Sequence, residues 1–343
     1  MNEMTKPVPA TTPADWASDQ EVRWCPGCGD YAILKSIQRT MPELGARPEN
    51  TVFISGIGCS SRFPYYMETY GFHTIHGRAP AVATGVKLAN PELDVWIVTG
   101  DGDGLSIGGN HMLHLLRRNL DCQVLLFNNE IYGLTKGQYS PTSRVGTTSP
   151  STPWGSVERP VFPCEFALGA GARFIARVID TAQKQMPDVL KRAYAHKGTS
   201  FIEIYQNCVV YNDGVFEGFT DKRNAANTQI WLEHGKPMLF ANGTKGLRVN
   251  TNTLRMEVAD VVDGDASDIV VHDETNKAIA KMLVSMRFPE FPVALGVIFC
   301  DTRPSFGDAL RAQRQSHNSG TTADLNALLR KGNSWEVRSG GEG

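Results

Sequence analysis

The feature that most constrains the fold is a series of short apolar runs that alternate with helix-like segments. Thr51–Ser55, Val95–Thr99 and Gln123–Phe127 read as strands, and the last two are continuous apolar runs. Runs of this kind are typical of a sheet that helices cover on both faces. Ala79–Asn90 and Leu105–Asn119 lie between them and carry apolar residues at helical spacing. The repetition of strand, helix and strand predicts an α/β fold with a parallel sheet.

The chain of 343 residues divides into three predicted parts. Residues 1–20 are rich in Pro, Thr and Ala without a period, so we expect a mobile N-terminal arm. Residues 21–219 hold the alternating pattern, and residues 220–343, which are more polar, form a predicted C-terminal accessory or interface region. Ser140–Pro163 interrupts the main part with Ser, Thr and Pro residues, and a loop of this length is usually functional or disordered.

Composition argues against several classes of protein. The net charge is −2 and no basic run is long, so nucleic acid is not an expected partner. The N-terminal residues lack the apolar segment of a signal peptide. No stretch approaches the roughly 18 apolar residues of a membrane span. We therefore expect a cytoplasmic protein with no membrane partner.

The chain contains seven cysteines. Without a secretory signal, an odd number favours metal binding or buried thiols over disulfides. Three of the seven lack the spacing of ligands and are interpreted as buried apolar thiols, namely Cys122, Cys164 and Cys300.

The other four cysteines form a candidate metal or cluster site. Cys25 and Cys28 belong to a Cys-x₂-Cys turn, in which Pro26 and Gly27 let both side chains face one metal. Cys59 lies in a glycine-rich run, and Cys208 follows the strand-like run Phe201–Tyr205. Four thiolates suit a [4Fe–4S] cluster or a structural zinc ion. The irregular spacing favours the cluster over zinc, and unligated thiols remain the third interpretation.

A second constellation favours a diphosphate and Mg²⁺. Asp101 follows the strand Val95–Thr99, and Asn129 follows Gln123–Phe127, so both lie where parallel strands end and ligands bind. The Asp101 carboxylate, the Asn129 amide oxygen and the carbonyl of Ile131 are oxygen donors of the kind that Mg²⁺ prefers. Glycines at positions 100, 102 and 104 allow the backbone to approach a phosphate.

Other phosphate motifs do not fit this run. A dinucleotide fingerprint counted from Gly100 needs a third glycine where Leu105 stands, and no P-loop sequence occurs. Ordinary turn chemistry of Gly, Asp and Asn residues remains an alternative interpretation.

These residues resemble a known family. Gly100-Asp101-Gly102 followed by Asn128-Asn129 is similar to the motif of thiamine-diphosphate enzymes. Four longer runs resemble the β subunits of 2-oxoacid:ferredoxin oxidoreductases, with the closest match to the 2-oxoglutarate type, and the resemblance as a whole covers about residues 20–215. The runs are Trp24-Cys25-Pro26-Gly27-Cys28-Gly29, Gly56-Ile57-Gly58-Cys59-Ser60, His76-Gly77-Arg78-Ala79, and Asn128 to Gln138.

The resemblance implies a thiamine-diphosphate-binding fold and a role for each matching position. One [4Fe–4S] cluster would be held by Cys25, Cys28, Cys59 and Cys208. Mg²⁺ would be held by Asp101, Asn129 and the Ile131 carbonyl. Contacts to thiamine diphosphate would come from Ile57, Gly58, Cys59, Ser60, Gly102, Asp103, Gly133 and Leu134.

The implied activity is the coenzyme A-dependent oxidative decarboxylation of a 2-oxo acid, most closely 2-oxoglutarate, to an acyl-CoA and CO₂. Electrons would pass through the cluster to ferredoxin, and the reaction could also run in reverse. In this family the carboxylate that activates the cofactor's aminopyrimidine comes from another subunit. We therefore expect an α subunit to complete the site, in an α₂β₂ heterotetramer.

Two further residues are candidates for contact with the substrate. Arg62 lies three residues past Cys59, and its guanidinium could bind a substrate carboxylate in a bidentate manner. His76 could orient the substrate or stabilise a developing oxyanion. An interface arginine and a structural histidine are the simpler alternatives.

Alternative functions remain open at the level of sequence. They are a pyruvate-specific or broad-specificity oxidoreductase of the same type, a non-redox thiamine decarboxylase with a structural metal, and a non-catalytic electron-transfer subunit.

Overall fold

The structure is a computed structural model that describes residues 11–317, 324–335 and 337. The described residues up to 307 form one compact unit, and the described residues from 308 onward form a second. Helix α10 (Phe306–Ser316) begins in the first unit and ends in the second, which also contains α11 (Leu325–Leu329). All the candidate site residues belong to the first unit.

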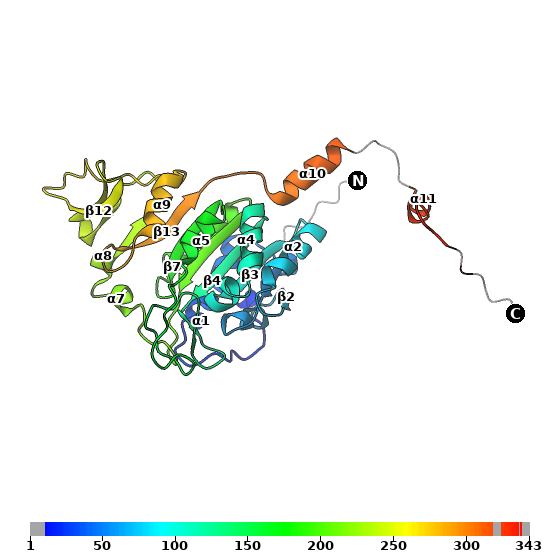
Figure 1. Ribbon diagram of the computed structural model, residues 1–343, viewed down its shortest axis with the longest axis horizontal. Coiled ribbons are helices and arrows are strands. Elements are labelled where there is room, and N and C mark those ends of the chain that lie inside the picture. Colours follow the sequence, from blue (N-terminus) through cyan, green and yellow to red (C-terminus); the bar gives the residue numbers. More distant parts are fainter. Residues whose placement is uncertain (1–10, 318–323, 336, 338–343) are drawn as a thin grey trace. The chain divides into compact units, whose positions relative to one another are not determined.

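The first unit is built on an eight-stranded sheet with the strand order β2-β1-β3-β4-β8-β7-β13-β9 (Figure 1). Neighbouring strands run parallel except β13, which pairs with β7 in the antiparallel direction. The predicted α/β fold with a largely parallel sheet is therefore confirmed. The strands are β1 (Thr51–Ser55), β2 (Tyr70–His73), β3 (Asp94–Gly100), β4 (Cys122–Asn128), β7 (Phe174–Ile179), β8 (Thr199–Tyr205), β9 (Gln229–Leu232) and β13 (Val293–Cys300).

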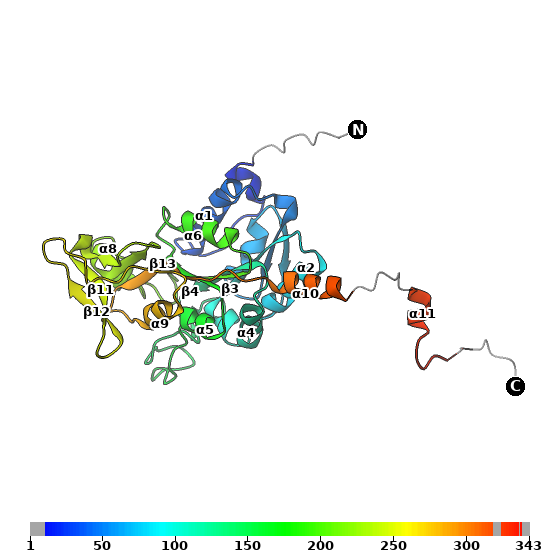
Figure 2. The same cartoon turned by 90° about the horizontal axis from the view of Figure 1, so that it is seen from above.

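Helices cover both faces of this sheet, as Figure 2 shows from above. On one face lie α1 (Asp30–Glu43) and α6 (Met186–Ala195), whose apolar residues join a core with Phe53, Trp96 and Phe127. The other face carries α2 (Ala79–Ala89), α4 (Gly109–Arg118), α5 (Pro163–Gly169) and α9 (Lys277–Ser285), which pack in a second core. Strands buried on both faces explain the continuous apolar runs in the sequence.

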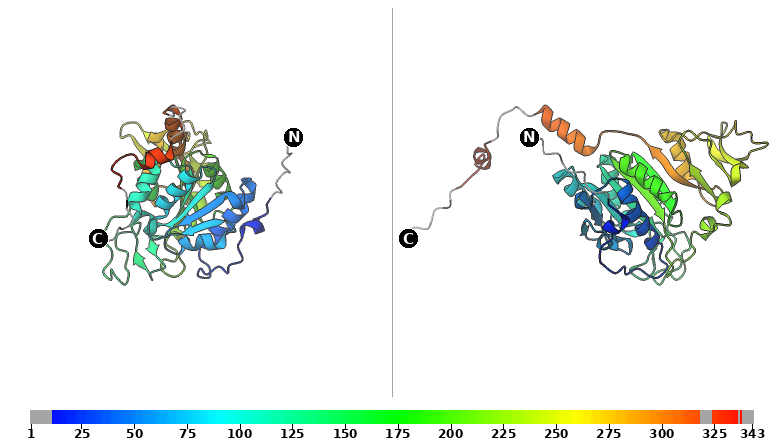
Figure 3. Two further views of the ribbon diagram at one scale, coloured as in Figure 1. Left: turned by 90° about the vertical axis from the view of Figure 1, so that its right-hand side faces the viewer. Right: turned by 180° about the vertical axis from the view of Figure 1, so that it is seen from behind.

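Smaller elements complete the first unit. Strands β10 (Leu239–Phe240), β11 (Lys245–Asn250) and β12 (Arg255–Asp260) form a separate antiparallel sheet, drawn in yellow in Figure 3. A two-stranded hairpin joins β5 (Ile131–Tyr132) and β6 (Gln138–Tyr139). The remaining helices are α3 (Asp101–Leu105), α7 (Glu217–Thr220), α8 (Ala225–Thr228), and the 3₁₀ helices η1 (Pro13–Trp16), η2 (Pro48–Asn50), η3 (Ser60–Tyr66) and η4 (Ala241–Gly243).

Two segments differ from the expected division of the chain. The first ten residues of the expected arm lie outside the described residues, but residues 11–20 include η1, whose Trp16 is completely buried. Trp16 therefore anchors this segment in the core that contains α1, and a mobile arm over residues 1–20 stays a prediction. The main sheet also takes β9 and β13 from beyond residue 219. A functional division of the chain at residue 219 stays a prediction.

The helix expected over Leu105–Asn119 begins later, as α4 at Gly109, and only its first residue Leu105 lies in the preceding helix α3. The break falls at Gly108, where a Cβ atom would lie 2.4 Å from the Asp103 carbonyl oxygen and 3.0 Å from Gly77. The chain turns here because the backbones of two segments approach closely, and periodicity in the sequence does not report such an approach.

The fold brings four loops to one edge of the sheet. Strands β1, β3, β4 and β8 are adjacent and parallel, so the segments that follow them leave from the same edge. These segments carry Cys59, Asp101, Asn129 and Cys208. Open α/β sheets bind their ligands at this edge.

Among the helices that the structure describes, none has both the length and the apolar character needed to cross a membrane.

Candidate active site

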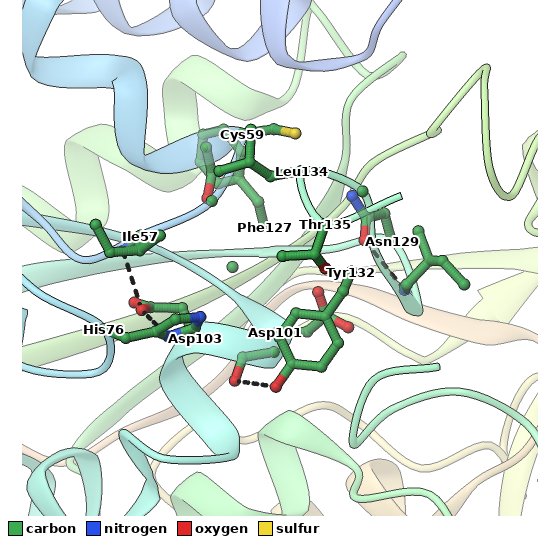
Figure 4. Close-up of a pocket in the computed structure, with 16 residues that line it drawn as sticks. Ile57, Cys59, His76, Asp101, Asp103, Phe127, Asn129, Tyr132, Leu134 and Thr135 are labelled. Atoms are coloured by element: carbon green, nitrogen blue, oxygen red, sulfur yellow. Dashed lines mark hydrogen bonds and ion pairs between the residues drawn. The ribbon is translucent and has the colours of Figure 1, made fainter. Parts of the chain in front are cut away.

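The predicted cofactor and magnesium residues line one pocket, shown in Figure 4. The walls come from the segments after β1, β3 and β4, and His76 is contributed by the segment between β2 and α2. The pocket is lined by Ile57, Gly58, Cys59, Ser60, His76, Asp101, Gly102, Asp103, Asn129, Ile131, Gly133 and Leu134, together with Gly100, Phe127, Tyr132 and Thr135. Every residue that the sequence assigned to thiamine diphosphate or Mg²⁺ is in this set. We call it the cofactor pocket.

Asp101 is the buried anion of the cofactor pocket. Its side chain is 2% exposed, and one carboxylate oxygen accepts hydrogen bonds from the hydroxyls of Ser140 (2.5 Å) and Thr142 (2.6 Å). Burial raises the pKa of Asp101 to about 6, against the opposing effect of these two hydroxyls. No salt bridge within the described ranges reaches this carboxylate. A buried carboxylate without a cation is costly, so the site suits a bound cation.

Asn129 offers the second oxygen donor. Its side-chain oxygen accepts a hydrogen bond from the Ile131 amide at 3.2 Å and has a second lone pair to offer. Its side-chain nitrogen donates to Gln206 at 2.8 Å. Carboxylate, amide oxygen and carbonyl oxygen are the donor set that Mg²⁺ takes together with phosphate oxygens, so these residues fit the metal.

Asp103 holds the loops of the pocket together. One oxygen accepts hydrogen bonds from the backbone amides of Ile57 (3.0 Å) and Gly77 (2.7 Å), and the other accepts from Thr99 (2.6 Å). The Nδ1 atom of His76 lies 2.8 Å from Asp103 Oδ1, although its orientation is outside hydrogen-bond geometry. Asp103 thus fixes the loop after β1 and the segment before α2, and brings His76 to the wall.

Gly102 makes room for the ring of Tyr132. A Cβ atom at position 102 would lie 2.2 Å from this ring, and the Tyr132 hydroxyl donates to the Gly102 carbonyl at 3.0 Å. The glycine therefore allows close packing of an aromatic wall against the start of α3.

The Cys-x₂-Cys segment forms the expected tight turn. The Cys28 amide donates to the Cys25 carbonyl at 3.0 Å, and Gly27 has a φ of +83°. Pro followed by a residue with positive φ is typical of a type II turn, which explains Pro26 and Gly27 between the two cysteines.

The four predicted cysteine ligands line a second pocket of about 240 Å³. Cys25, Cys28, Cys59 and Cys208 share its wall with Arg23, Trp24, Asp30, Arg62, Asn129, Gly133, Leu134, Gln206, Val209, Val210 and Tyr211. We call it the cysteine pocket. Its chemistry of four sulfur donors fits a four-iron cluster.

The described thiols are not gathered around a single point. Within the described ranges, no group of three or more His, Cys, Asp or Glu side chains is close enough to hold one metal ion. A zinc ion would draw its four sulfurs to about 2.3 Å from one centre. The choice between a cluster and zinc at the cysteine pocket stays a prediction.

Burial changes the chemistry of two of these thiols, Cys59 and Cys28. It raises the pKa of Cys59 to about 12, and it raises the pKa of Cys28 further, with Asp30 adding to the effect. Both side chains are therefore protonated thiols at neutral pH, and a metal centre that binds them must displace the protons.

The two pockets adjoin. Cys59, Asn129, Gly133 and Leu134 line both of them. A Cβ atom at Gly133 would lie 3.5 Å from the sulfur of Cys59 and 3.7 Å from that of Cys208. The short segment after β4 therefore forms a wall between the cofactor pocket and the cysteine pocket.

Arg62 lines the cysteine pocket and is not part of the cofactor pocket wall. Its Nε atom donates to the Tyr66 hydroxyl at 2.9 Å, and its guanidinium lies near the rings of Tyr65 and Tyr66. Contact of Arg62 or His76 with a substrate stays a prediction.

Sequence reasoning missed three polar residues of the site. Ser140 and Thr142 come from the long loop Ser140–Pro163, whose Ser and Thr content was the available signal. Gln206, two residues before Cys208, is 1% exposed and contacts both Asn129 and Cys28. No motif marks a single glutamine of this kind.

The remaining cysteines lie outside both pockets. Cys122 and Cys164 are buried as expected, whereas Cys300 is only partly buried. The Cys164 thiol donates to Glu203, which forms a buried ion pair with Arg177.

The site geometry agrees with comparisons to known proteins. Residues 56–204 match the family "Thiamine pyrophosphate enzyme, C-terminal TPP binding domain". This segment begins directly after β1 and contains β3, β4 and the whole wall of the cofactor pocket, so the fold and site define a thiamine-diphosphate-binding protein.

Similarity to whole chains identifies the family. The chain is 50% identical over 331 residues to the 2-oxoglutarate oxidoreductase subunit KorB of Mycobacterium tuberculosis, covering 94% of this chain and 88% of the relative. It is 49% identical over 190 residues to 2-oxoacid:ferredoxin oxidoreductase 1, subunit beta, of Aeropyrum pernix, covering 55% and 60% of the two chains. The chain belongs to the β-subunit family of the 2-oxoacid:ferredoxin oxidoreductases.

A solved structure has the same fold over nearly the same length. It is a 2-oxoglutarate:ferredoxin oxidoreductase from Magnetococcus marinus with 2-oxoglutarate, coenzyme A and succinyl-CoA bound. The TM-score is 0.76 at 33% sequence identity, with 94% of this chain and 97% of that chain covered.

Proposed function

We propose that this chain is the β subunit of a 2-oxoglutarate:ferredoxin oxidoreductase. With a partner subunit, it converts 2-oxoglutarate and coenzyme A to succinyl-CoA and CO₂ and passes the electrons to ferredoxin. The observation that carries the proposal is that the cofactor pocket and the cysteine pocket share a wall. A redox enzyme of this type needs its carbon chemistry and its electron acceptor side by side.

The names of similar proteins support the substrate. The Mycobacterium tuberculosis relative is a 2-oxoglutarate oxidoreductase subunit, and the Magnetococcus marinus enzyme holds 2-oxoglutarate and coenzyme A. Each resembles this chain over most of its length.

The proposed cofactors follow from the donor sets. Asp101, Asn129 and the Ile131 carbonyl would hold Mg²⁺ and through it the diphosphate. Cys25, Cys28, Cys59 and Cys208 would hold one [4Fe–4S] cluster. When bound, thiamine diphosphate supplies the carbanion chemistry of decarboxylation and the cluster accepts electrons singly.

The residues of this chain contribute position and charge. Asp103 holds the loops that carry Ile57 and His76 at the pocket wall. Gly133 leaves space between the cofactor pocket and the sulfurs of Cys59 and Cys208. Arg62 lies on the cysteine side of this wall, where its cation is a candidate to meet a substrate carboxylate.

The proposal is tested by anaerobic co-purification with the partner subunit. Iron, acid-labile sulfide and thiamine diphosphate are measured per chain, and the reduction of a low-potential acceptor is assayed with 2-oxoglutarate or pyruvate and coenzyme A. We expect one four-iron cluster and faster reduction with 2-oxoglutarate. Preference for pyruvate would indicate the broader or pyruvate-specific type. A colourless, zinc-containing protein that decarboxylates without an electron acceptor would support a non-redox enzyme instead.

Cysteine variants test the ligand set. Cys25→Ser removes one predicted thiolate ligand and should abolish the cluster, whereas Cys300→Ser should leave it, because Cys300 lies outside the cysteine pocket. The measurements are iron content and the visible absorbance of the anaerobic protein. Equal iron in both variants would contradict the proposed ligands.

A further inference from the structure

One buried side chain contacts both predicted metal sites. Gln206 follows β8 and is 1% exposed. Its nitrogen donates to the sulfur of Cys28 at 3.2 Å, and its oxygen accepts from the side-chain nitrogen of Asn129 at 2.8 Å. Cys28 is a predicted cluster ligand and Asn129 a predicted magnesium ligand, so a single amide spans the wall between the two pockets.

The surroundings of Gln206 fix which way its amide points. Its nitrogen also donates to the carbonyl of Asn207 at 2.6 Å. A carbonyl oxygen can only accept, and a ligating thiolate can only accept. The reversed amide would set two oxygens 2.6 Å apart. The nitrogen of Gln206 must therefore face Cys28 and Asn207, and its oxygen must face Asn129.

This orientation in turn fixes the amide of Asn129. Because the Gln206 oxygen can only accept, the nitrogen of Asn129 must turn toward it. The oxygen of Asn129 is then on the other side, where it accepts from the Ile131 amide and lines the cofactor pocket. Gln206 and the Ile131 amide therefore favour the same orientation of the Asn129 amide, which leaves the oxygen available as a metal ligand.

The main chain holds Gln206 in this place. Its backbone amide donates to the carbonyl of Asn128 at 2.9 Å, which extends the pairing of β8 with β4. A Cβ atom at Gly29 would lie 3.0 Å from Cγ of Gln206, so the glycine after Cys28 lets the cysteine turn approach this side chain.

We propose that Gln206 is a positioning residue that couples the cysteine site to the magnesium ligand Asn129. Its N–H group stabilises negative charge on the Cys28 sulfur and so favours the reduced cluster, and its oxygen presents the Asn129 oxygen to the metal. The inference rests on the proposed function, since it takes the two sites as cluster and magnesium sites. Partners of metal ligands are known to set both affinity and potential.

Two variants separate the two halves of this role. Gln206→Met removes both the donor and the acceptor, whereas Gln206→Glu keeps an acceptor for Asn129 but loses the amide donor to Cys28. Gln183→Met is the control variant. The side-chain nitrogen of Gln183 also donates to backbone carbonyls, those of Ala32 and Asp180. Within the described ranges, no hydrogen bond of Gln183 reaches a predicted metal ligand.

Two measurements are made on each anaerobic holoprotein. Redox titration followed by electron paramagnetic resonance gives the cluster midpoint potential, and calorimetry gives the Mg²⁺-dependent affinity for thiamine diphosphate. Gln206→Met should weaken that affinity roughly 10- to 100-fold. The same variant should also lower the midpoint potential of the cluster by at least about 59 mV, which corresponds to a tenfold shift of the one-electron equilibrium toward the oxidised cluster. Gln206→Glu should lower the potential and bind the cofactor as the wild type does.

Several outcomes would overturn the inference. If Gln206→Met matches Gln183→Met in both measurements, or changes one and not the other, Gln206 does not couple the sites. If Gln206→Met loses its iron, the Gln206→Glu variant decides, because an unchanged potential there contradicts the role of the donor. A wild-type protein without cluster or thiamine diphosphate would instead refute the proposed function, before any variant is compared.

Discussion

At the scale of single residues, Asp101 is the buried carboxylate that most clearly suits a bound metal cation. It is buried, it lies on the wall of the cofactor pocket, and its neighbours are hydroxyl groups. Asp101→Ala removes the charged oxygen donor. We expect the Mg²⁺-dependent affinity for thiamine diphosphate to fall more than about 100-fold, beyond the usual effect of outer partners. The cluster should stay, because Asp101 is not part of the cysteine pocket.

Thiamine diphosphate and iron per chain, measured after anaerobic dialysis, check this expectation. Asp94→Ala is the control, since Asp94 is at the opposite end of the same strand and bonds to Tyr194. Retention of the cofactor by Asp101→Ala would show that the magnesium site is elsewhere.

The predicted role of Arg62 can be tested by comparing two substrates that differ in a distal carboxylate. A dicarboxylic substrate carries a distal carboxylate, and burying it without a cation is costly. Hydrogen bonds to charged groups contribute about 1.5–3 kcal/mol, so Arg62→Ala should lower kcat/KM for 2-oxoglutarate roughly 10- to 150-fold. Pyruvate lacks the distal carboxylate and should be affected less.

The comparison of the two substrates decides between interpretations of Arg62. Arg62→Lys should not restore the wild-type rate, because an ammonium group does not replace a planar bidentate donor. Equal losses for both substrates would indicate that Arg62 serves the cofactor, the cysteine site or the subunit interface. No loss with either would make it a structural arginine held by Tyr66.

At the scale of secondary structure, a buried ion pair ties β7 to β8. Arg177 and Glu203 are cross-strand neighbours with atoms 2.8 Å apart, and their side chains are 7% and 0% exposed. Glu203 also accepts from Asn128, which accepts from Thr142 beside Asp101. Breaking a buried pair leaves an uncompensated charge, so Arg177→Met should lower the free energy of unfolding by about 3–5 kcal/mol.

The small sheet provides a matched control for this pair. Arg248 and Glu257 are also cross-strand neighbours, but their side chains are 46% and 32% exposed. Exposed pairs contribute about 0–1 kcal/mol, so Arg248→Met should change stability little. Denaturant unfolding of both variants measures the difference, and similar losses would contradict the importance of burial.

The same scale shows what the sequence could predict. The run Thr51–Ser55 matches β1, because an apolar β-branched segment buried on both faces has a clear signature. Asp101 and Asn129 were predicted from the rule that polar residues after parallel strands meet at one edge. Trp16 and Gly108 depend on contacts with distant segments, and local periodicity does not record them. Gln206 was missed for the same reason, because its side chain bonds to Asn129 and Cys28, which are far away in the sequence.

The resemblance to a family selected the four cysteines as one ligand set, a choice that their spacing alone left open. The spacing of the cysteines was compatible with zinc, a cluster or free thiols. The conclusion that Cys25, Cys28, Cys59 and Cys208 belong together agrees with their shared pocket. The widely separated positions become neighbours because β1 and β8 leave the sheet at the same edge, with β3 and β4 between them.

At the scale of the whole molecule, the acids of the cofactor pocket are already engaged. Asp101 accepts from Ser140 and Thr142, and Asp103 accepts from Ile57, Gly77 and Thr99. Asp101 is the proposed Mg²⁺ ligand and Asp103 holds the loops of the pocket, so we expect the carboxylate that activates the aminopyrimidine of thiamine diphosphate to come from a partner chain. This agrees with the β-subunit designation of the Aeropyrum pernix relative, which implies a partner chain. The chain should therefore carry both metal sites while needing its partner for turnover.

Reconstitution tests this division of labour. The chain purified alone under anaerobic conditions should contain the cluster but show no measurable reduction of a low-potential acceptor with 2-oxoglutarate and coenzyme A. Addition of the α subunit should produce turnover, with a rate that saturates at one α per β. The Asp101→Ala chain should still associate with α in gel filtration and yet remain inactive, because its defect is in the cofactor pocket. Turnover by the isolated chain at the rate of the complex would show that the site is complete without a partner.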